Sequence, residues 1–179
     1  MTLETLMPDI LIRPLEEKDI LACAKVNVAT WQHAYADIID ADYLAAMSVE
    51  KSFDEWQSVF LNAQKNSQRH FMVAVDKQEK VYGYSSVIIP NECNFWTSLL
   101  TTLYVLPTHH GQSVGKKLLV AAKNWAVQQG AATMGLWVFA ENKLAIDFYL
   151  HQGFEKQAHI QEKIIGARTH FLESYMMRL

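Results

Sequence analysis

The sequence predicts a mixed α/β fold in which helices cover a β-sheet. In some segments apolar residues recur every three or four positions, as in amphipathic helices, and in others they alternate or cluster, as in strands. Helical segments come first, strands follow, and the two kinds then alternate, which is typical of a mixed sheet. The 179 residues include 7 glycines and 4 prolines, scattered without a linker or repeat, so we expect one domain spanning 1–179.

Helices dominate the first third of the chain. A short strand is expected to close at Pro14, and the helix after it places Leu21, Ala24, Val28 and Trp31 on one face. The expected elements here are a strand at 10–13 and helices at 17–33, 42–47 and 50–66.

Strands dominate the rest of the chain. The polar turn at 76–79 separates the first two, and Gly130 and Asn142 predict a helix stop and a helix cap. The expected strands are at 71–75, 81–89, 97–105, 134–139, 154–164 and 169–177, and the helices at 114–129 and 142–151.

Charge and composition argue against several kinds of partner. The formal net charge is −3, whereas nucleic-acid binders usually carry a basic excess. No apolar run approaches the roughly 20 residues of a membrane-spanning helix, and no basic segment with an apolar run suggests a signal peptide. The two cysteines, Cys23 and Cys93, lack metal-ligand spacing, and so few thiols favour a reducing, cytoplasmic location.

The segment 103–119 has a pattern suited to an anionic ligand. An apolar strand runs into a turn with Gly111 and Gly115 and then directly into an amphipathic helix. The unpaired N–H groups of a helix start attract phosphate, and glycine lets the backbone approach it closely. Two glycines alone are weak evidence, so a plain connecting loop remains the alternative. The adjacent His109 and His110 do not predict a metal site, because neighbouring side chains share no helical face.

Two motifs resemble those of GNAT acetyltransferases. The first is the acetyl-CoA motif, written Gln/Arg-x-x-Gly-x-Gly/Ala, which here spans 110–115 and follows a strand ending in Val-x-Pro. His110 replaces its first residue, and Ser113 replaces its middle glycine. The second is Asn-x-x-Ala-x-x-Phe-Tyr-x-x-x-Gly-Phe, which the segment 142–154 matches at every specified position.

The resemblance implies the fold, the cofactor and the reaction. It implies the GNAT acyl-CoA N-acyltransferase fold, a central, mostly antiparallel, twisted sheet flanked by helices. It also implies direct transfer of the acetyl group of acetyl-CoA to a primary amine, without an acyl-enzyme or a metal. The cofactor-binding residues that it implies are Leu103, Tyr104, Val105, His110, Gly111, Gln112, Ser113, Val114, Gly115, Lys116, Asn142, Ala145 and Phe148.

The resemblance also implies catalytic roles. Backbone N–H groups at 103–105 would stabilise the oxyanion, and a bulge would turn them toward the ligand. Tyr149 would give a proton to the leaving thiolate. Many relatives carry a glutamate as base on this strand, but 98–102 has none. The candidate bases are Glu92, His33 and a water held by Thr101 or Thr102.

Several of these residues also have a purely structural interpretation. Asn142 suits a helix cap as well as a cofactor contact, and Lys117 suits a solvated helix face. Trp31 and Tyr35, with Thr101, are candidates for the acceptor site, although both aromatic residues also suit the core. Trp56 is expected in the core.

The acceptor is less defined by the sequence. The last third of the chain faintly resembles GNAT proteins that act on polyamines and other small amines. A protein N-terminus or a lysine is the alternative acceptor, and an acyl-CoA-binding module without turnover is the alternative function. The resemblance is also compatible with a homodimer.

Overall fold

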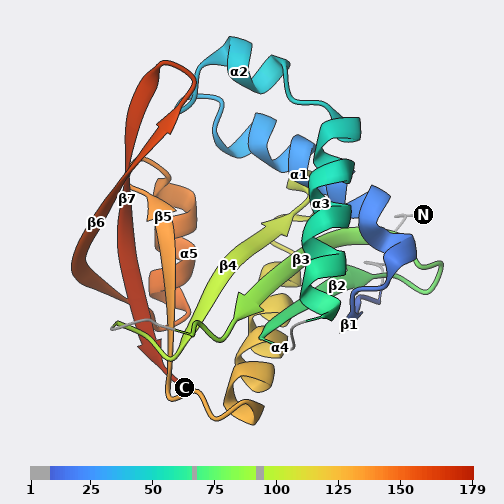
Figure 1. The fold of residues 1–179 in the computed structure, drawn as a ribbon, viewed down its shortest axis with the longest axis vertical. Helices are drawn as coiled ribbons and strands as arrows, with labels where there is room; N and C mark the ends of the chain where they lie inside the picture. The colour runs from blue at the N-terminus through green and yellow to red at the C-terminus, as the bar shows by residue number, and fades with distance from the viewer. Residues whose placement is uncertain (1–8, 66–67, 92–94) are drawn as a thin grey trace, which may run out of the picture.

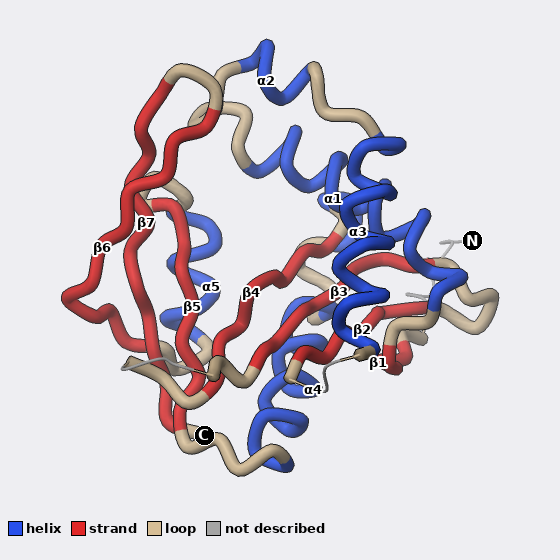
Figure 2. The backbone as a smooth tube through the Cα atoms, in the orientation of Figure 1, coloured by secondary structure: helices blue, strands red, loops and turns tan. Residues whose placement is uncertain are grey.

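The computed structural model describes residues 9–65, 68–91 and 95–179. Its sheet has seven strands in the order β1-β2-β3-β4-β5-β7-β6. Neighbouring strands are antiparallel except β4 and β5, which run parallel. The strands are β1 (Leu11–Pro14), β2 (Arg69–Val75), β3 (Val81–Ile88), β4 (Ser98–Val105), β5 (Thr133–Phe139), β6 (Glu155–Ile165) and β7 (Arg168–Arg178). The mixed α/β fold and its mostly antiparallel sheet are confirmed (Figures 1 and 2).

The helices lie where the apolar periodicity predicts them. They are α1 (Ile20–Ala34), α2 (Ala41–Ala45), α3 (Val49–Gln64), α4 (Val114–Gln128) and α5 (Lys143–His151). Two short 3-10 turns, η1 (Glu17–Asp19) and η2 (Pro107–His109), were not expected. The Ser48 side chain caps α3 by accepting from the Lys51 N–H, and Asn142 caps α5 as predicted.

The helices cover both faces of the sheet. Successive residues of β2 point to different cores: Val73 packs with α1 and α3, and Ala74 packs with α4. α4 buries Leu118 and Leu119 against the sheet, while α5 adds Ile146 to the same side. Figure 2 shows α3 lying across the front of β2 and β3.

The sheet opens between β4 and β5. These two strands pair only from Ser98 to Leu100, opposite Met134 to Leu136, and then diverge (Figure 1). On the other edge of β4, the register with β3 shifts between Ser86 and Val87, which leaves Thr101 as the extra residue of a bulge. β4 therefore has a bulge, but at Thr101, before the stretch 103–105 where it was expected and at the point where β4 leaves β5.

The β6–β7 hairpin packs against the end of α1 and the connection to α2. Ile165 and Phe139 share a core cluster with Tyr35 and Ile39. An ion pair of 3.0 Å joins Arg168 Nε to Asp40 Oδ1. The hairpin and the α1–α2 connection thus bridge the two halves of the sheet beyond the divergence.

Candidate active site

Two backbone amides of β4 face the divergence. Leu106 donates its N–H to the Tyr82 carbonyl of β3 at 2.8 Å, so alternate amides of this strand point to β3 and those between them point away. Leu103 and Val105 are the residues between. Since pairing with β5 has already ended at Leu100, their N–H groups meet no strand of the described residues on that side.

The loop after β4 opens directly onto the start of α4. Gly111 has a φ of +75° and Ser113, the residue before the helix, has a φ of +61°. The first bond across the helix start joins Lys117 N to Ser113 O at 3.0 Å, so the earlier amides of α4 have no intrahelical partner. Such amides, at the positive end of the helix dipole, suit a pyrophosphate.

Ser113 occupies a left-handed conformation that favours glycine. This conformation costs a non-glycine residue roughly 1–2 kcal/mol. The Ser113 side chain makes no capping hydrogen bond to α4. The family's glycine at this position therefore has a conformational reason, and Ser113 keeps the backbone shape at a cost in stability.

The His110 side chain turns back toward β4. Its Nε2 lies 2.9 Å from the Val105 carbonyl oxygen, so that nitrogen carries the proton and donates. The ring also stands 6.1 Å from the ring of His33. His110, an exposed residue, therefore ties the loop to the strand end, and its Nδ1 is the ring nitrogen left to contact a ligand.

The two lysines of α4 differ in their contacts. Lys116 is exposed at the start of the helix. The Lys117 ammonium donates to the Ile10 carbonyl at 3.1 Å, so this side chain ties α4 to the segment before β1. Lys117 is exposed, as expected for a solvated helix face, and it makes this contact in addition.

α5 presents the second motif to this loop. The Asn142 side chain accepts from the Ala145 N–H at 3.2 Å, which fixes the start of the helix. A Cβ built on Gly115 would lie 3.5 Å from the Phe148 ring, so α4 and α5 approach closely there. Tyr149 packs against the rings of Phe148 and Phe154, at 5.3 and 5.5 Å.

Three phenols are close enough to influence one another. Burial raises the pKa of Tyr149, and the nearby Tyr104 raises it further. Burial likewise raises the pKa of Tyr35, with contributions from Tyr104 and Tyr149. All three phenols therefore stay protonated at neutral pH, and Tyr149 can act as a proton donor.

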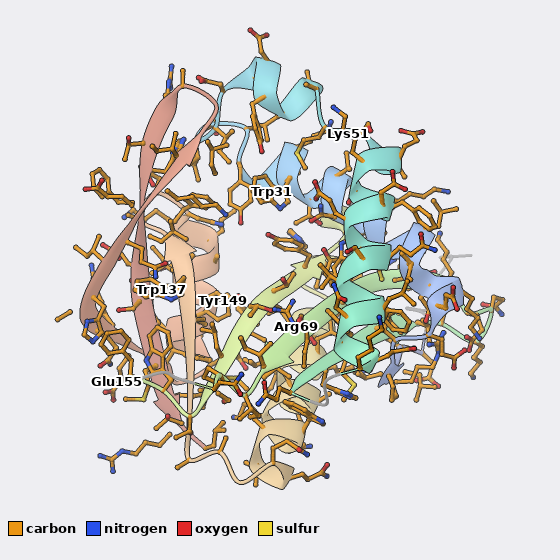
Figure 3. The ribbon with its side chains drawn as sticks, viewed as in Figure 1. Trp31, Lys51, Arg69, Trp137, Tyr149 and Glu155 are labelled. Atoms are coloured by element: carbon orange, nitrogen blue, oxygen red, sulfur yellow. The ribbon has the colours of Figure 1, made fainter. Side chains whose placement is uncertain are left out.

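Aromatic side chains line the α1 side of this cluster. The Trp31 Nε1–H donates to the Tyr104 hydroxyl at 2.9 Å, and the Trp31 and Tyr35 rings meet edge to face at 5.0 Å. Tyr35 in turn contacts the Phe139 ring at 5.0 Å. Figure 3 shows Trp31 near α1, above the upper end of β4, and Tyr149 near α5, to the left of β4. Residues of α1 and β4, which are far apart in the sequence, thus meet here, and they include the candidate acceptor residues Trp31 and Tyr35.

The candidate bases lie in different parts of the structure. His33 is exposed and lies beside His110. Thr101 donates from its side chain to the Ser86 carbonyl at 3.1 Å, and Thr102 lies beside it at the bulge. Glu92 lies outside the described residues, as does Cys93. Cys23 is buried in the α1 core, where desolvation raises the pKa of its thiol.

Sequence reasoning missed a pocket beneath α3. Arg69, Ser86 and Thr102 line it together with Trp56, which also packs against the Phe71 and Tyr84 rings as a core residue. No motif joins these residues, because they come from four separate elements. An arginine at the start of a mostly apolar strand is the only signal in the sequence.

The described ranges contain neither a group of metal ligands nor a membrane-spanning helix. Among residues 9–65, 68–91 and 95–179, no three or more His, Cys, Asp or Glu side chains are grouped to hold a metal ion. Within those same ranges, no helix has the length and apolar character to cross a bilayer.

A sheet that opens beside unpaired amides and a protonated phenol suits an enzyme that takes an acyl group from coenzyme A. The family model described as "Acetyltransferase (GNAT) family" matches residues 26–154. The chain therefore belongs to the GNAT family of acetyltransferases, and it is an acetyl-CoA-dependent N-acetyltransferase.

Three comparisons illustrate the relationship. The uncharacterized N-acetyltransferase YuaI of Bacillus subtilis is 30% identical over 158 residues, 88% of this chain and 87% of the relative. The spermidine N(1)-acetyltransferase of Thermoplasma acidophilum is 26% identical over 145 residues, 80% of this chain and 87% of the relative. The crystal structure of a PaiA N-acetyltransferase from Thermoplasma acidophilum, in complex with coenzyme A, superposes with a TM-score of 0.70 at 24% identity, covering 93% of this chain and 98% of that one.

Proposed function

We propose that this enzyme transfers the acetyl group of acetyl-CoA directly to a primary amine of a small molecule. The observation that carries the proposal is that the amides of Leu103 and Val105 face the divergence, while Tyr104 on the same strand is close enough to raise the pKa of Tyr149. A thioester held there would meet hydrogen-bond donors and a proton donor together. Holding both reactants in place removes much of the entropic barrier.

The cofactor would lie along the amide-lined side of the sheet. The free amides of α4 after Ser113 would hold the pyrophosphate, with Gly111 and Gly115 allowing close approach. Lys116 would add positive charge at the helix start. Leu103 and Phe148 would contact the pantetheine arm near the opening of the sheet.

The chemistry needs one addition and one elimination. The amine nitrogen forms a bond to the thioester carbonyl carbon, and the amides of Leu103 and Val105 stabilise the resulting oxyanion. The carbonyl then re-forms, the C–S bond breaks, and the thiolate takes the proton of Tyr149. The proton lost by the nitrogen leaves through water near Thr101, since β4 carries no carboxylate. Solvent restores the proton of Tyr149 before the next cycle.

Polyamines are the acceptor class that relatives support. The 26%-identical relative is named as a spermidine acetyltransferase. The aromatic rings of Trp31 and Tyr35 would suit the ammonium groups of a polyamine. A protein N-terminus or a lysine is the alternative acceptor, and a dimer with a second copy of the chain is a further proposal.

One observation favours a second function. His110 and Ser113 replace two motif residues, and the first turns its ring to the Val105 carbonyl. This favours an acyl-CoA-binding module without turnover. Calorimetry with CoA and acetyl-CoA, followed by transfer assays on a panel of amines, separates the two. Binding with transfer supports the enzyme, whereas binding without transfer to any amine supports the module.

A further inference from the structure

The pocket beneath α3 lies next to the proposed reaction centre. Phe71 pairs with Ser86, and Ser86 pairs with Thr102, so these residues form a row across β2, β3 and β4. Arg69 precedes Phe71 by two residues and shares its face of the sheet. Thr102 follows the bulge at Thr101, where β4 leaves β5. The pocket therefore begins beside the point where the thioester would lie.

The walls of the pocket come from α3. Glu55, Trp56 and Val59 complete the lining, and the volume is about 180 Å³. That volume exceeds the roughly 30 Å³ of one water molecule several-fold, so a small organic group fits. The Trp56 ring lies 4.7 Å from the Tyr84 ring, which lies 5.7 Å from that of Tyr104. Aromatic contacts thus connect the pocket to the phenols near Tyr149.

Arg69 is a half-buried cation without an anionic partner. Within the described part of the chain its guanidinium has no ion pair or hydrogen bond, and its Cζ lies 5.8 Å from the centre of the Phe71 ring. Burial lowers the pKa of Arg69, although a guanidinium stays protonated. Glu55 lines the same pocket but is exposed on the rim and forms no ion pair with Arg69. Burying an unpaired charge is costly, so an anion entering the pocket would be stabilised.

Ser86 supplies the second unpaired donor. It is 1% exposed, and its Oγ has no hydrogen-bond partner among the described residues. A buried hydroxyl without a partner is costly, and most such groups in native proteins are satisfied. Ser86 and Arg69 line one pocket, so a single group with several acceptor oxygens could satisfy both side chains once it displaces the contacts that cover the buried hydroxyl.

We infer that the acceptor amine carries an anionic group, a carboxylate or a phosphate, which binds Arg69 and the Ser86 hydroxyl while the amine meets the thioester. This inference rests on the proposed function and narrows its substrate class to small amines such as amino acids or amino phosphates. It favours these acceptors over the polyamines that the relatives' names suggest, because the second ammonium of a polyamine would enter beside an unpaired guanidinium. Figure 3 shows Arg69 between Tyr149 and α3, as this arrangement requires.

Matched acceptors test the inference. Acetyl transfer by the full chain is measured for a panel of amino acids, each paired with the amine left when its carboxylate is removed, including ornithine with putrescine. Phosphoethanolamine is paired with ethanolamine to separate phosphate from carboxylate. We expect kcat/KM to be roughly 10-fold or more higher for the anionic member, as expected for a charge-assisted hydrogen bond. Equal or better use of the members without an anion would overturn the inference.

Variants assign the effect to this pocket. Arg69→Gln should raise KM for the anionic acceptor roughly 10- to 100-fold, and Ser86→Ala by a smaller factor, with CoA affinity unchanged. Arg69→Lys should restore part of the loss, which also shows that the fold tolerates change there. Lys51→Gln, an exposed cation elsewhere on α3, is the matched control and should change nothing. An equal loss for both members of a pair would contradict an anion site.

The outcomes separate this inference from the proposed function. Transfer that prefers putrescine to ornithine leaves the enzyme assignment standing and removes only the anionic acceptor. CoA binding without transfer to any amine on the panel refutes the proposed function, and the acceptor assignment falls with it.

Discussion

On the α4 side of the sheet, the groups that would bind the cofactor are mainly backbone amides, whereas the α1 and α3 side is built from side chains. The amides belong to one strand, one loop and one helix start, all between Leu103 and Lys116. The side chains of Trp31, Arg69 and Thr102 come from three different elements. Amide positions follow from secondary structure, so a local motif can carry cofactor binding. The α1 and α3 side, where we propose that the acceptor binds, can change one side chain at a time without disturbing that framework.

The largest effect is expected at Tyr149, where the two sides meet. Tyr149→Phe keeps the ring packing on Phe148 and Phe154 but removes the proton donor. Turnover should fall about 100-fold or more, the usual contribution of general acid catalysis, while calorimetric CoA affinity stays unchanged. Tyr43→Phe, an exposed tyrosine on α2, is the control. Equal turnover in wild type and Tyr149→Phe would remove Tyr149 from the acid role.

The pH profile sharpens the same assignment. The acid form of Tyr149 is present below its pKa and lost above it, and burial raises that pKa above the ordinary value of about 10. Wild-type turnover should therefore rise as the acceptor amine loses its proton and show no alkaline decline below about pH 10. A decline that begins near pH 8 and persists in Tyr149→Phe would point to another group.

Substitutions at Gly115 test whether backbone groups at the start of α4 bind the cofactor. A Cβ fits there beside Phe148, at 3.5 Å, but a longer side chain would push α4 and α5 apart. Gly115→Ala should bind CoA almost normally, and Gly115→Ile should weaken binding roughly 10-fold, about 1.4 kcal/mol. Calorimetry measures both variants. If Gly115→Ile binds CoA like wild type, the close approach of this helix start to the cofactor is wrong.

A substitution at Trp31 tests whether side chains on the α1 and α3 side bind the acceptor. Trp31→Phe removes the donor to the Tyr104 hydroxyl, and the loss of one hydrogen bond of about 1 kcal/mol should raise the acceptor KM roughly fivefold. CoA affinity should not change, because Trp31 lies on α1. Trp125→Phe, on α4, is the matched control, since that ring stacks on His70 instead. A larger change in CoA affinity than in acceptor KM would show that Trp31 affects cofactor binding, contrary to the proposed division of the two binding sites.

The smallest effect is expected at Ser113. Glycine adopts the φ of +61° without strain, but it also gains freedom in the unfolded chain. The two terms partly cancel, so Ser113→Gly should raise the free energy of unfolding by about 0.5 kcal/mol. Denaturant titration measures the change. Destabilisation would show that the Ser113 side chain contributes contacts that outweigh its strain.

The sequence by itself determined the elements and the family. Apolar spacing predicts every helix and strand to within a few residues, because each element buries one face at its own period. The Asn142 cap and the glycine turn at Gly111 are likewise local, since they depend on neighbouring backbone groups. The motif at 142–154 predicts the position of Tyr149 for the same reason.

Only the tertiary structure decided how the acceptor side is assembled. The contact of Trp31 with Tyr104 spans 73 positions of the chain, and the row from Phe71 to Thr102 depends on strand register. The turn of His110 toward Val105 and the bond from Lys117 to Ile10 are also set by packing. Spacing along a chain reports which face a residue shares with its near neighbours. It does not report which distant strand or helix will lie against that face, because that depends on how all the elements pack together.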